Sequence, residues 1–241
     1  LNSLKNDLMG NIEADKESRS DWEKTYRNGL EYLGMKYEER SAPFEGASGV
    51  MHPLLAESVT QFQAQAYNEL LPSQGPVKTQ VLGMTTPETE QQAARVQEFM
   101  NYQLMQVMKE YDPETDQMLF YLPLSGSAFR KVYYDQNLGR AVSKFIPSED
   151  LIVPYAATDL HSATRITHVI NMSMNDIRKL QQVGFYSDVK IDSASMMADE
   201  TDEIQEEIDE LQGVSPSYSD DDTCKVHEIH TELDIPGFED M

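Results

Sequence analysis

Histidine, cysteine and acidic residues near the end of the chain are the first candidates for chemistry. His227 and His230 stand beside Glu228, Glu232 and Cys224, and these residue types can bind zinc. The alternating pattern around them predicts a β-strand, however, and an H-x-x-H spacing on a strand sends the two imidazoles to opposite faces. The cysteine is the single one in the chain, so it has no second thiolate. We therefore expect no metal here, with an accidental or structural ion as the alternative.

Sequence motifs of nucleotide-binding proteins and hydrolases are missing. Neither G-x-x-x-x-G-K-[ST] nor G-x-G-x-x-G occurs, and the cluster 46–49 has no Lys or Arg close enough to hold a phosphate. The run 125–127 (Ser-Gly-Ser) lacks both the G-x-S-x-G elbow and an evident histidine partner, which indicates a tight turn. The run 220–222 (three Asp) lacks the spaced ligands and the glycine of a calcium loop. The sequence predicts no enzyme and no cofactor.

A basic and aromatic run is the best nucleic-acid candidate. Arg130 and Lys131 are followed by Tyr133 and Tyr134 on a predicted hairpin. Alternation along a strand places Arg130 and Tyr134 on one face and Lys131 and Tyr133 on the other, which splits the basic-aromatic patch that single-stranded nucleic acids prefer. Contact of Arg130 and Lys131 with DNA stays a candidate role, and packing within the hairpin is the favoured one.

Uncharged polar residues cluster on the helix predicted over residues 53–71. Gln61, Gln63, Gln65 and Asn68 offer donors and acceptors without charge. Such a surface suits a contact between copies that forms and shifts without burying ions. Gln61, Gln65 and Asn68 are therefore the candidate subunit-interface residues, and a solvent-exposed polar face is the competing interpretation.

Charge is spread unevenly along the 241 residues. Residues 1–185 hold 17 Lys/Arg and 24 Asp/Glu, a balance of −7, whereas residues 186–241 hold 2 and 18, a balance of −16; together they give −23. A field of this sign repels phosphate, which argues against a grip on nucleic acid through a basic face. The lone cysteine excludes an intrachain disulfide and favours a reducing compartment. No apolar run approaches the ~20 residues that span a bilayer, so we expect no membrane partner.

Helices dominate the first half of the predicted structure. Residues 2–19 and a continuation after Ser20 carry apolar residues four apart, and Pro53 opens the next helix. Thr86 and Pro87 are an N-cap and first-turn pair for a helix extending to about residue 107, and another helix follows from 112 to about 122. The expected core faces are Leu55, Val59, Phe62, Ala66 and Leu70 on the 53–71 helix, and Val96, Phe99, Met100, Leu104 and Val107 on the next one. Residues 77–82 have the pattern of a short strand.

The second half is mixed. Residues 128–134 and 140–146 predict a hairpin with a Gly-containing loop, and 151–153, 165–170 and 224–233 predict further strands. Ser173 and Gly184 are the start and stop signals of a short helix. The fold class is α+β, a helical first half followed by a region with a β-hairpin and short strands. The segments expected are 1–124 (helical), 125–187 (hairpin and mixed α/β), 188–222 (acidic) and 223–241 (a strand leading onward).

The acidic segment 188–222 carries a thin apolar stripe with acids on every other face. Like charges four residues apart destabilise a helix, so we expect a solvated helix or partial disorder there. Leu1 is not an initiator methionine, and Met241 closely follows a Pro-Gly turn. We expect the chain to be part of a longer polypeptide.

Five stretches resemble the amino-terminal region of portal proteins of tailed bacteriophages, of the podovirus type. They lie within about residues 20–188: Trp22–Met35 (WEKTYRNGLEYLGM), Pro43–Gly83, Gln97–Asp135 (ending in LPLSGSAFRKVYYD), Pro147–Tyr155 (PSEDLIVPY) and Arg165–Ile170. Residues 195–222 have no counterpart and look like an insertion. The patterns are long but mark a family rather than a mechanism.

The resemblance implies a wing domain of a homododecameric ring at one capsid vertex of the virion, assembled in the host bacterial cytoplasm. Its implied partners are terminase, the major capsid and scaffolding proteins, tail adaptors and the double-stranded DNA that passes through during packaging and ejection. The family has no active site to carry over. Another virion head-tail connector, or a scaffold-binding adaptor without a DNA channel, is the alternative.

Overall fold

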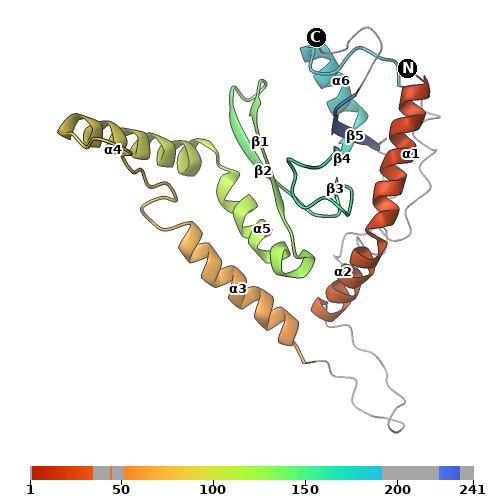
Figure 1. The fold of residues 1–241 in the computed structure, drawn as a ribbon, viewed down its shortest axis with the longest axis horizontal. Helices are drawn as coiled ribbons and strands as arrows, with labels where there is room; N and C mark the ends of the chain where they lie inside the picture. The colour runs from red at the N-terminus through yellow and green to blue at the C-terminus, as the bar shows by residue number, and fades with distance from the viewer. Residues whose placement is uncertain (1, 35–43, 45–51, 192–222, 234–241) are drawn as a thin grey trace. The chain divides into compact units, whose positions relative to one another are not determined.

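The computed structural model describes residues 2–34, 44, 52–191 and 223–233, and it confirms the α+β class. The chain divides into two compact units (Figure 1). The first unit comprises residues 1–52 and 149–241, and the second comprises residues 53–148. These boundaries differ from the segments drawn on the sequence, because compactness depends on contacts between distant residues and the segments followed local composition. Of the acidic segment 188–222, all but 188–191 lies outside the described residues.

The first unit joins the amino-terminal helices to a small antiparallel sheet. Its described elements are α1 (Asn2–Ser18), α2 (Ser20–Leu33), β3 (Leu151–Ile152), β4 (Arg165–Ser173), α6 (Met174–Val183) and β5 (Thr223–Thr231). β4 is central and pairs antiparallel with β3 and with β5, from Arg165 opposite Thr231 to Ser173 opposite Thr223. Ile12, Leu151 and Ile177 are among its buried apolar residues.

Local signals explain the short helix α6. The Ser173 hydroxyl accepts a hydrogen bond from the Asp176 amide at 3.2 Å, as expected for an N-cap. Gly184 ends the helix in the left-handed conformation at φ 80°. Both predicted signals are confirmed.

The second unit combines helices with the hairpin. Its described elements are α3 (Leu54–Leu70), α4 (Pro87–Tyr102), the π-helical turn η1 (Gln103–Val107), α5 (Tyr111–Ser125), β1 (Phe129–Asp135) and β2 (Arg140–Ile146). β1 and β2 pair antiparallel, and the Asp135 carboxylate accepts the amides of Asn137 and Leu138 in the turn. The predicted hairpin is confirmed.

Helix α5 holds the second unit together. It packs against α3 and β2, and Leu119 on α5 and Val59 on α3 are only 2% and 1% exposed. Glu114 on α5 accepts the Phe145 amide at 2.7 Å, and Glu110, just before α5, pairs with Arg140 at 2.7 Å. These carboxylates satisfy groups of β2, whose edge would otherwise be open to other strands.

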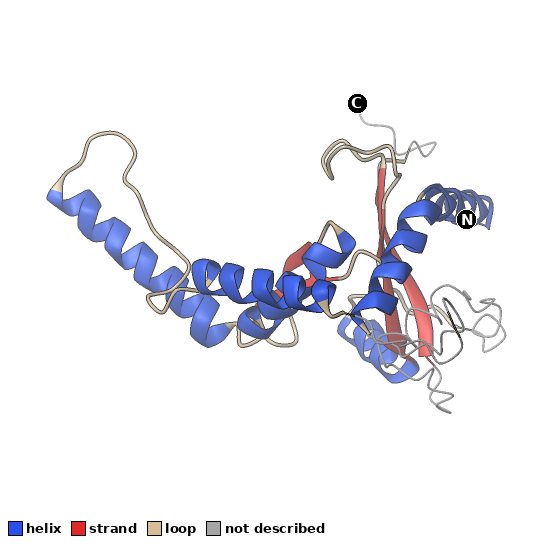
Figure 2. Ribbon diagram, turned by 90° about the horizontal axis from the view of Figure 1, so that it is seen from below, coloured by secondary structure: helices blue, strands red, loops and turns tan. Residues whose placement is uncertain are grey.

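One expectation for the local structure of the second unit is wrong. Residues 77–82 form no strand, and Figure 2 draws the segment between α3 and α4 as loop. The reason is that the amides of Val77 and Thr79 bond to the side chains of Asn101 and Gln97 instead of to a neighbouring backbone. The helix that begins after Thr86 reaches Val107 as predicted, and its last part, Gln103–Val107, is π-helical.

Candidate interaction surfaces

The outer face of α3 carries the three candidate interface residues. Gln61, Gln65 and Asn68 are exposed, and the Asn68 amide group donates to the Ala64 carbonyl at 2.8 Å on its own helix. Gln63, which the sequence pattern grouped with them, faces α5 instead: its Nε2 donates to Asp116 Oδ1 at 2.7 Å. The structure thus brings Gln61, Gln65 and Asn68 to one accessible face.

The inner side of α3 is tied to α5 by a second polar contact. The Tyr67 hydroxyl donates to Asp112 Oδ1 at 2.6 Å. This hydrogen bond, with smaller contributions from burial and nearby carboxylates, raises the pKa of the Tyr67 phenol above its ordinary value. Phe62, expected in the core stripe, is 40% exposed and Leu70 is 50% exposed, because the side of α3 that meets α5 is centred on Val59.

The two basic candidates on the hairpin have separate environments. Arg130 Nη2 donates to Thr115 Oγ1 at 2.6 Å, and its guanidinium carbon lies 4.6 Å from the centre of the Tyr111 ring. The Lys131 ammonium lies 5.7 Å from the centre of the Tyr133 ring. Arg130 therefore serves packing against α5, and the structure does not gather the two cations into one patch.

Helix α4 contacts its own chain through polar side chains, whereas the helices of a globular domain usually pack through an apolar side. Asn101 accepts the Val77 amide at 2.9 Å and donates to the Val77 carbonyl at 3.1 Å. Gln97 accepts from the Thr79 amide, and Thr79 Oγ1 donates to the Ala93 carbonyl. Gln97 and Asn101 thus lie on the side of α4 that contacts its own chain, along the loop that follows α3, whereas Gln92, Arg95 and Glu98 are exposed.

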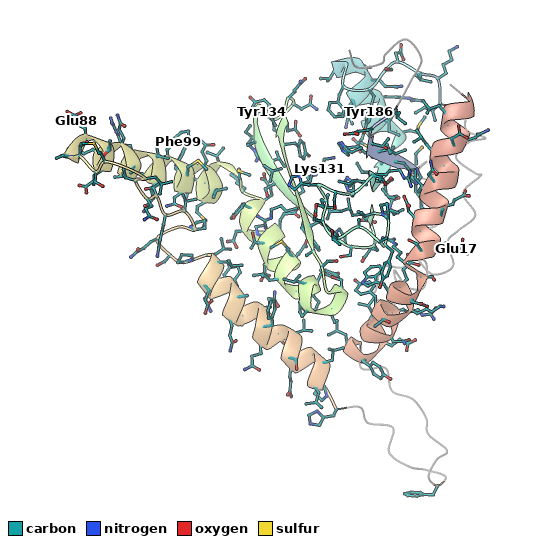
Figure 3. All side chains as sticks on the ribbon, viewed as in Figure 1. Glu17, Glu88, Phe99, Lys131, Tyr134 and Tyr186 are labelled. Atoms are coloured by element: carbon teal, nitrogen blue, oxygen red, sulfur yellow. The ribbon has the colours of Figure 1, made fainter. Side chains whose placement is uncertain are left out.

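The apolar side of α4 is exposed, contrary to the expected core face. Val96, Phe99, Met100 and Tyr102 are 52%, 59%, 41% and 55% exposed, and none of the described residues of α4 is buried. Figure 3 shows Phe99 on the surface of α4. Val96, Phe99 and Tyr102 are spaced three apart and lie on one side of the helix, and we call these three residues the outer face of α4. Sequence periodicity locates such a face, but it does not tell whether the same chain covers it.

The two units differ sharply in charge. Residues 53–148 hold 7 Lys/Arg and 10 Asp/Glu, a balance of −3, and the residues of the first unit hold 12 and 32, a balance of −20; together they give −23. The exposed outer faces of α3 and α4 both belong to the nearly neutral unit. The long-range repulsion between two copies of this chain therefore comes mainly from the other unit.

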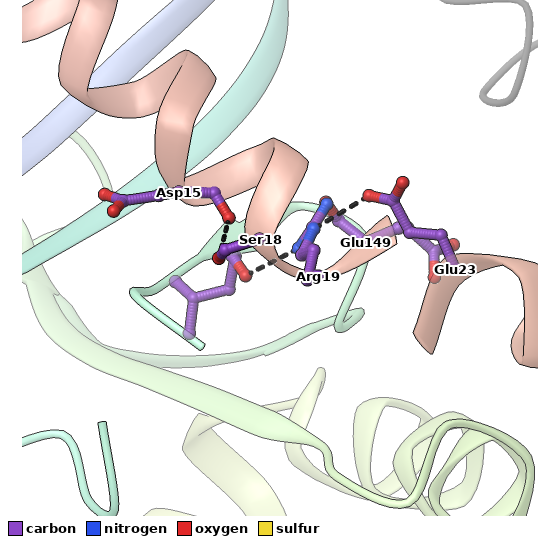
Figure 4. A network of polar contacts seen from close by, with 6 residues as sticks. Asp15, Ser18, Arg19, Glu23 and Glu149 are labelled. Atoms are coloured by element: carbon purple, nitrogen blue, oxygen red, sulfur yellow. Dashed lines mark hydrogen bonds and ion pairs between the residues drawn. The ribbon is translucent and has the colours of Figure 1, made fainter. Parts of the chain in front are cut away.

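A buried polar cluster occupies the junction of α1 and α2 in the first unit (Figure 4). Arg19 donates to Glu23 at 2.8 Å, to the Leu151 carbonyl at 3.1 Å and to the Glu149 carbonyl at 2.8 Å. One turn earlier, Asp15 pairs with Arg165 at 2.7 Å. Sequence reasoning missed this cluster, because apart from the Arg19–Glu23 pair its contacts join residues that are 130 or more positions apart in the chain. Its groups bond to one another and to backbone atoms, so the cluster holds α1 and α2 against residues 149–151 and Arg165. We call this cluster the lock.

The described part of the chain contains neither a metal-binding cluster nor a membrane-spanning helix. Within those residues, no group of three or more His, Cys, Asp or Glu is placed to hold a metal ion. None of the helices described there is both long enough and apolar enough to cross a membrane.

Comparisons with known proteins add no assignment. No family model matches this chain, and a search of the curated proteins returns no match.

Proposed function

We propose that this chain is a structural subunit of the portal ring at one capsid vertex of a tailed bacteriophage. In this role it forms part of the conduit through which double-stranded DNA is packaged and ejected. Terminase and tail proteins dock on the assembled ring, and capsid and scaffolding proteins surround it. The chain performs no catalysis in this role.

The observation that carries the proposal is the exposed outer face of α4 in a nearly neutral unit. Val96 and Phe99 are more than half exposed on a helix whose Gln97 and Asn101 side chains bond to its own chain. Large exposed apolar patches mark surfaces that bind other molecules. A ring of identical copies needs such a surface on every copy, since each subunit meets its neighbour through a heterologous interface.

The resemblance of five stretches within residues 20–188 to portal proteins directs this general inference to the portal ring. The acidic balance of −23 is compatible with a conduit, because cations on its wall would bind phosphates and slow the passage of DNA. Acidity alone also suits many soluble proteins, so the proposal rests on the resemblance and on the exposed face of α4.

Electron microscopy of the purified chain, with its mass in solution measured in parallel, tests the proposal. We expect closed rings with a central hole and a total mass that is a fixed multiple of the mass of one subunit. A uniform monomer or dimer at every concentration tried would contradict the ring and favour the head-tail adaptor instead. Addition of the scaffolding protein is the matched control, since it supplies a partner without changing the subunit.

A further inference from the structure

The outer face of α4 is fixed in its outward orientation. The opposite side of the helix is bonded to residues 77–79 through Gln97 and Asn101, so a rotation that buried Phe99 would break these hydrogen bonds. Thr86 and Thr89 cap the helix start by bonding each other's backbone amides. A face held in place before binding loses little conformational entropy on association.

Charge indicates what covers this face. Pro87–Tyr102 holds three Glu and one Arg, a balance of −2, in a chain whose total is −23. The hairpin 129–146 instead holds four cations and one Asp, a balance of +3. A second copy of this chain therefore carries a region of opposite charge to α4, in the unit where repulsion between copies is weakest.

The hairpin also presents apolar surface. Val132 and Tyr134 lie two apart on β1, which places them on the same face, and they are 66% and 65% exposed. Lys144 is exposed on the opposite face, where Lys131 is its cross-strand partner. Lys131 and Lys144 lie behind the apolar face, Arg130 lies on the same side as Tyr134, and Arg140 is paired with Glu110. The lysines would attract and orient α4 while the apolar contact supplies affinity. We call Val132 and Tyr134 the hairpin face.

We propose that the outer face of α4 docks on the hairpin face of a second copy of this chain. The inference rests on the proposed ring and identifies the contact between neighbouring subunits, which we call the seam. Figure 3 places Phe99 and Tyr134 on separate elements of one unit, so each copy offers one half of the contact to each of two neighbours. A heterologous contact of this kind repeats from copy to copy and closes when the rotation per copy allows it.

Two complementary variants test the seam in the full chain. The helix variant is Val96→Lys with Phe99→Lys, which sets like charge against the cations of the hairpin, and the hairpin variant is Val132→Glu with Tyr134→Glu. Each alone should fail to assemble, with association weakened about 30-fold or more. Mixed together, they should form a one-to-one dimer and nothing larger, because the mixture contains one intact α4 face and one intact hairpin face.

A matched control and a contact assay complete the test. Tyr155→Glu changes an aromatic residue of the first unit that is 66% exposed, and it should assemble as the unaltered chain does. A photoreactive benzoyl-phenylalanine in place of Phe99 should cross-link to residues 129–146 of an isotopically distinct copy. This second measurement needs no charged substitution, so it decides the matter even if the variants fold poorly.

The outcomes separate this inference from the ring itself. Rings that persist in the helix variant, or cross-links from α4 to α4, would overturn the seam and leave the ring standing. A mixed dimer without any ring in the unaltered chain would support the α4–hairpin contact and refute the portal ring. A chain that stays monomeric, with no mixed dimer and no cross-link, would sink both.

Discussion

The junction of α1 and α2 buries charged side chains, whereas the helix α4 exposes apolar ones. At the junction, the charged side chains of Arg19 and Glu23 are almost fully buried, at 9% and 7% exposed, and bond within the first unit. In α4, Gln97 and Asn101 face the chain and Phe99 faces outward at 59% exposed. Buried charges whose hydrogen-bond partners lie in the same chain are typical of a protein interior. A helix that exposes apolar residues and contacts its own chain through polar ones is typical of a surface that binds another molecule.

The energetics of the two regions follow from this difference. A buried ion pair gives little net stability, but loss of one partner leaves an uncompensated charge inside the protein. Helix α4 has none of its described residues buried, so it depends on its cap and on side-chain hydrogen bonds worth about 1 kcal/mol each. Substitutions at the junction should therefore cost far more stability than substitutions on the outer face of α4.

Arg19→Met should have the largest effect, because it leaves the Glu23 carboxylate buried and strips two carbonyls of their donor. We expect a loss of about 3–5 kcal/mol in the free energy of unfolding, measured by urea titration. Lys24→Met is the control, since its pair with Asp21 is exposed and should change stability by no more than about 0.5 kcal/mol. Equal losses for the two variants would refute the lock.

Gly75→Ala should come next, through the loop that lies on α4. Gly75 has φ 95°, and an added Cβ would lie 2.4 Å from Asn101 Cγ. We expect a cost of about 1–3 kcal/mol and weaker protection of the Val77 and Thr79 amides from hydrogen exchange. Gly83→Ala, at φ 99° with open space around it, separates backbone strain from the close contact. Identical exchange in both variants would rule out the Asn101 contact as the cause.

Thr86→Ala removes the cap of α4. We expect a loss of about 1 kcal/mol, seen as faster amide exchange in the first turn of α4. Thr86→Ser keeps the capping hydroxyl and should behave like the unaltered chain. Faster exchange spread evenly over both units would show that α4 is not an independently opening element.

Glu110→Gln should reduce the acid sensitivity of the second unit. The hydrogen bond from Arg140 is the largest of the effects that hold the pKa of the Glu110 carboxyl below its ordinary 4.5. A lowered folded-state pKa adds stability above the unfolded-state value, and this stability is lost as the pH falls through the folded one. The drop in melting temperature from pH 7 to pH 3 should be smaller in this variant. Glu98→Gln, exposed on α4, is the control.

Phe99→Gln should have the smallest effect on an isolated subunit. The side chain is 59% exposed, so we expect a change within about 0.5 kcal/mol in the free energy of unfolding. Leu119→Ala, at a position only 2% exposed, should cost about 2–5 kcal/mol in the same assay. A loss above 2 kcal/mol for Phe99→Gln would mean that α4 packs within its own subunit.

Much of the local structure could be predicted because its causes are local. The Thr86 and Ser173 caps, the Gly184 stop and the Asp135–Gly139 turn each depend on residues within a few positions of one another. The hairpin followed from alternation, and the α+β class followed from the order of these signals. The roles of Gln61, Gln65, Asn68 and Lys131 stay predictions, while Arg130 has an observed packing partner in Thr115.

The expectations that the structure contradicts concern which part of the chain, if any, packs against a given helix face or segment. Periodicity identified the apolar residues of α4 but not that they are exposed, and the strand expected over residues 77–82 is loop. Which side of α4 meets that segment depended on the reach of Asn101 and Gln97, which no repeat reveals.

By itself, the sequence determined where helices, turns and the hairpin begin and end, and it determined the excess of acid. These features arise from backbone preferences and from charges that act wherever the chain goes. Only the tertiary structure decided that Arg19 is buried and Phe99 is exposed. Burial is a sum over neighbours, and those of Arg19 are supplied by residues 149 and 151, far along the chain.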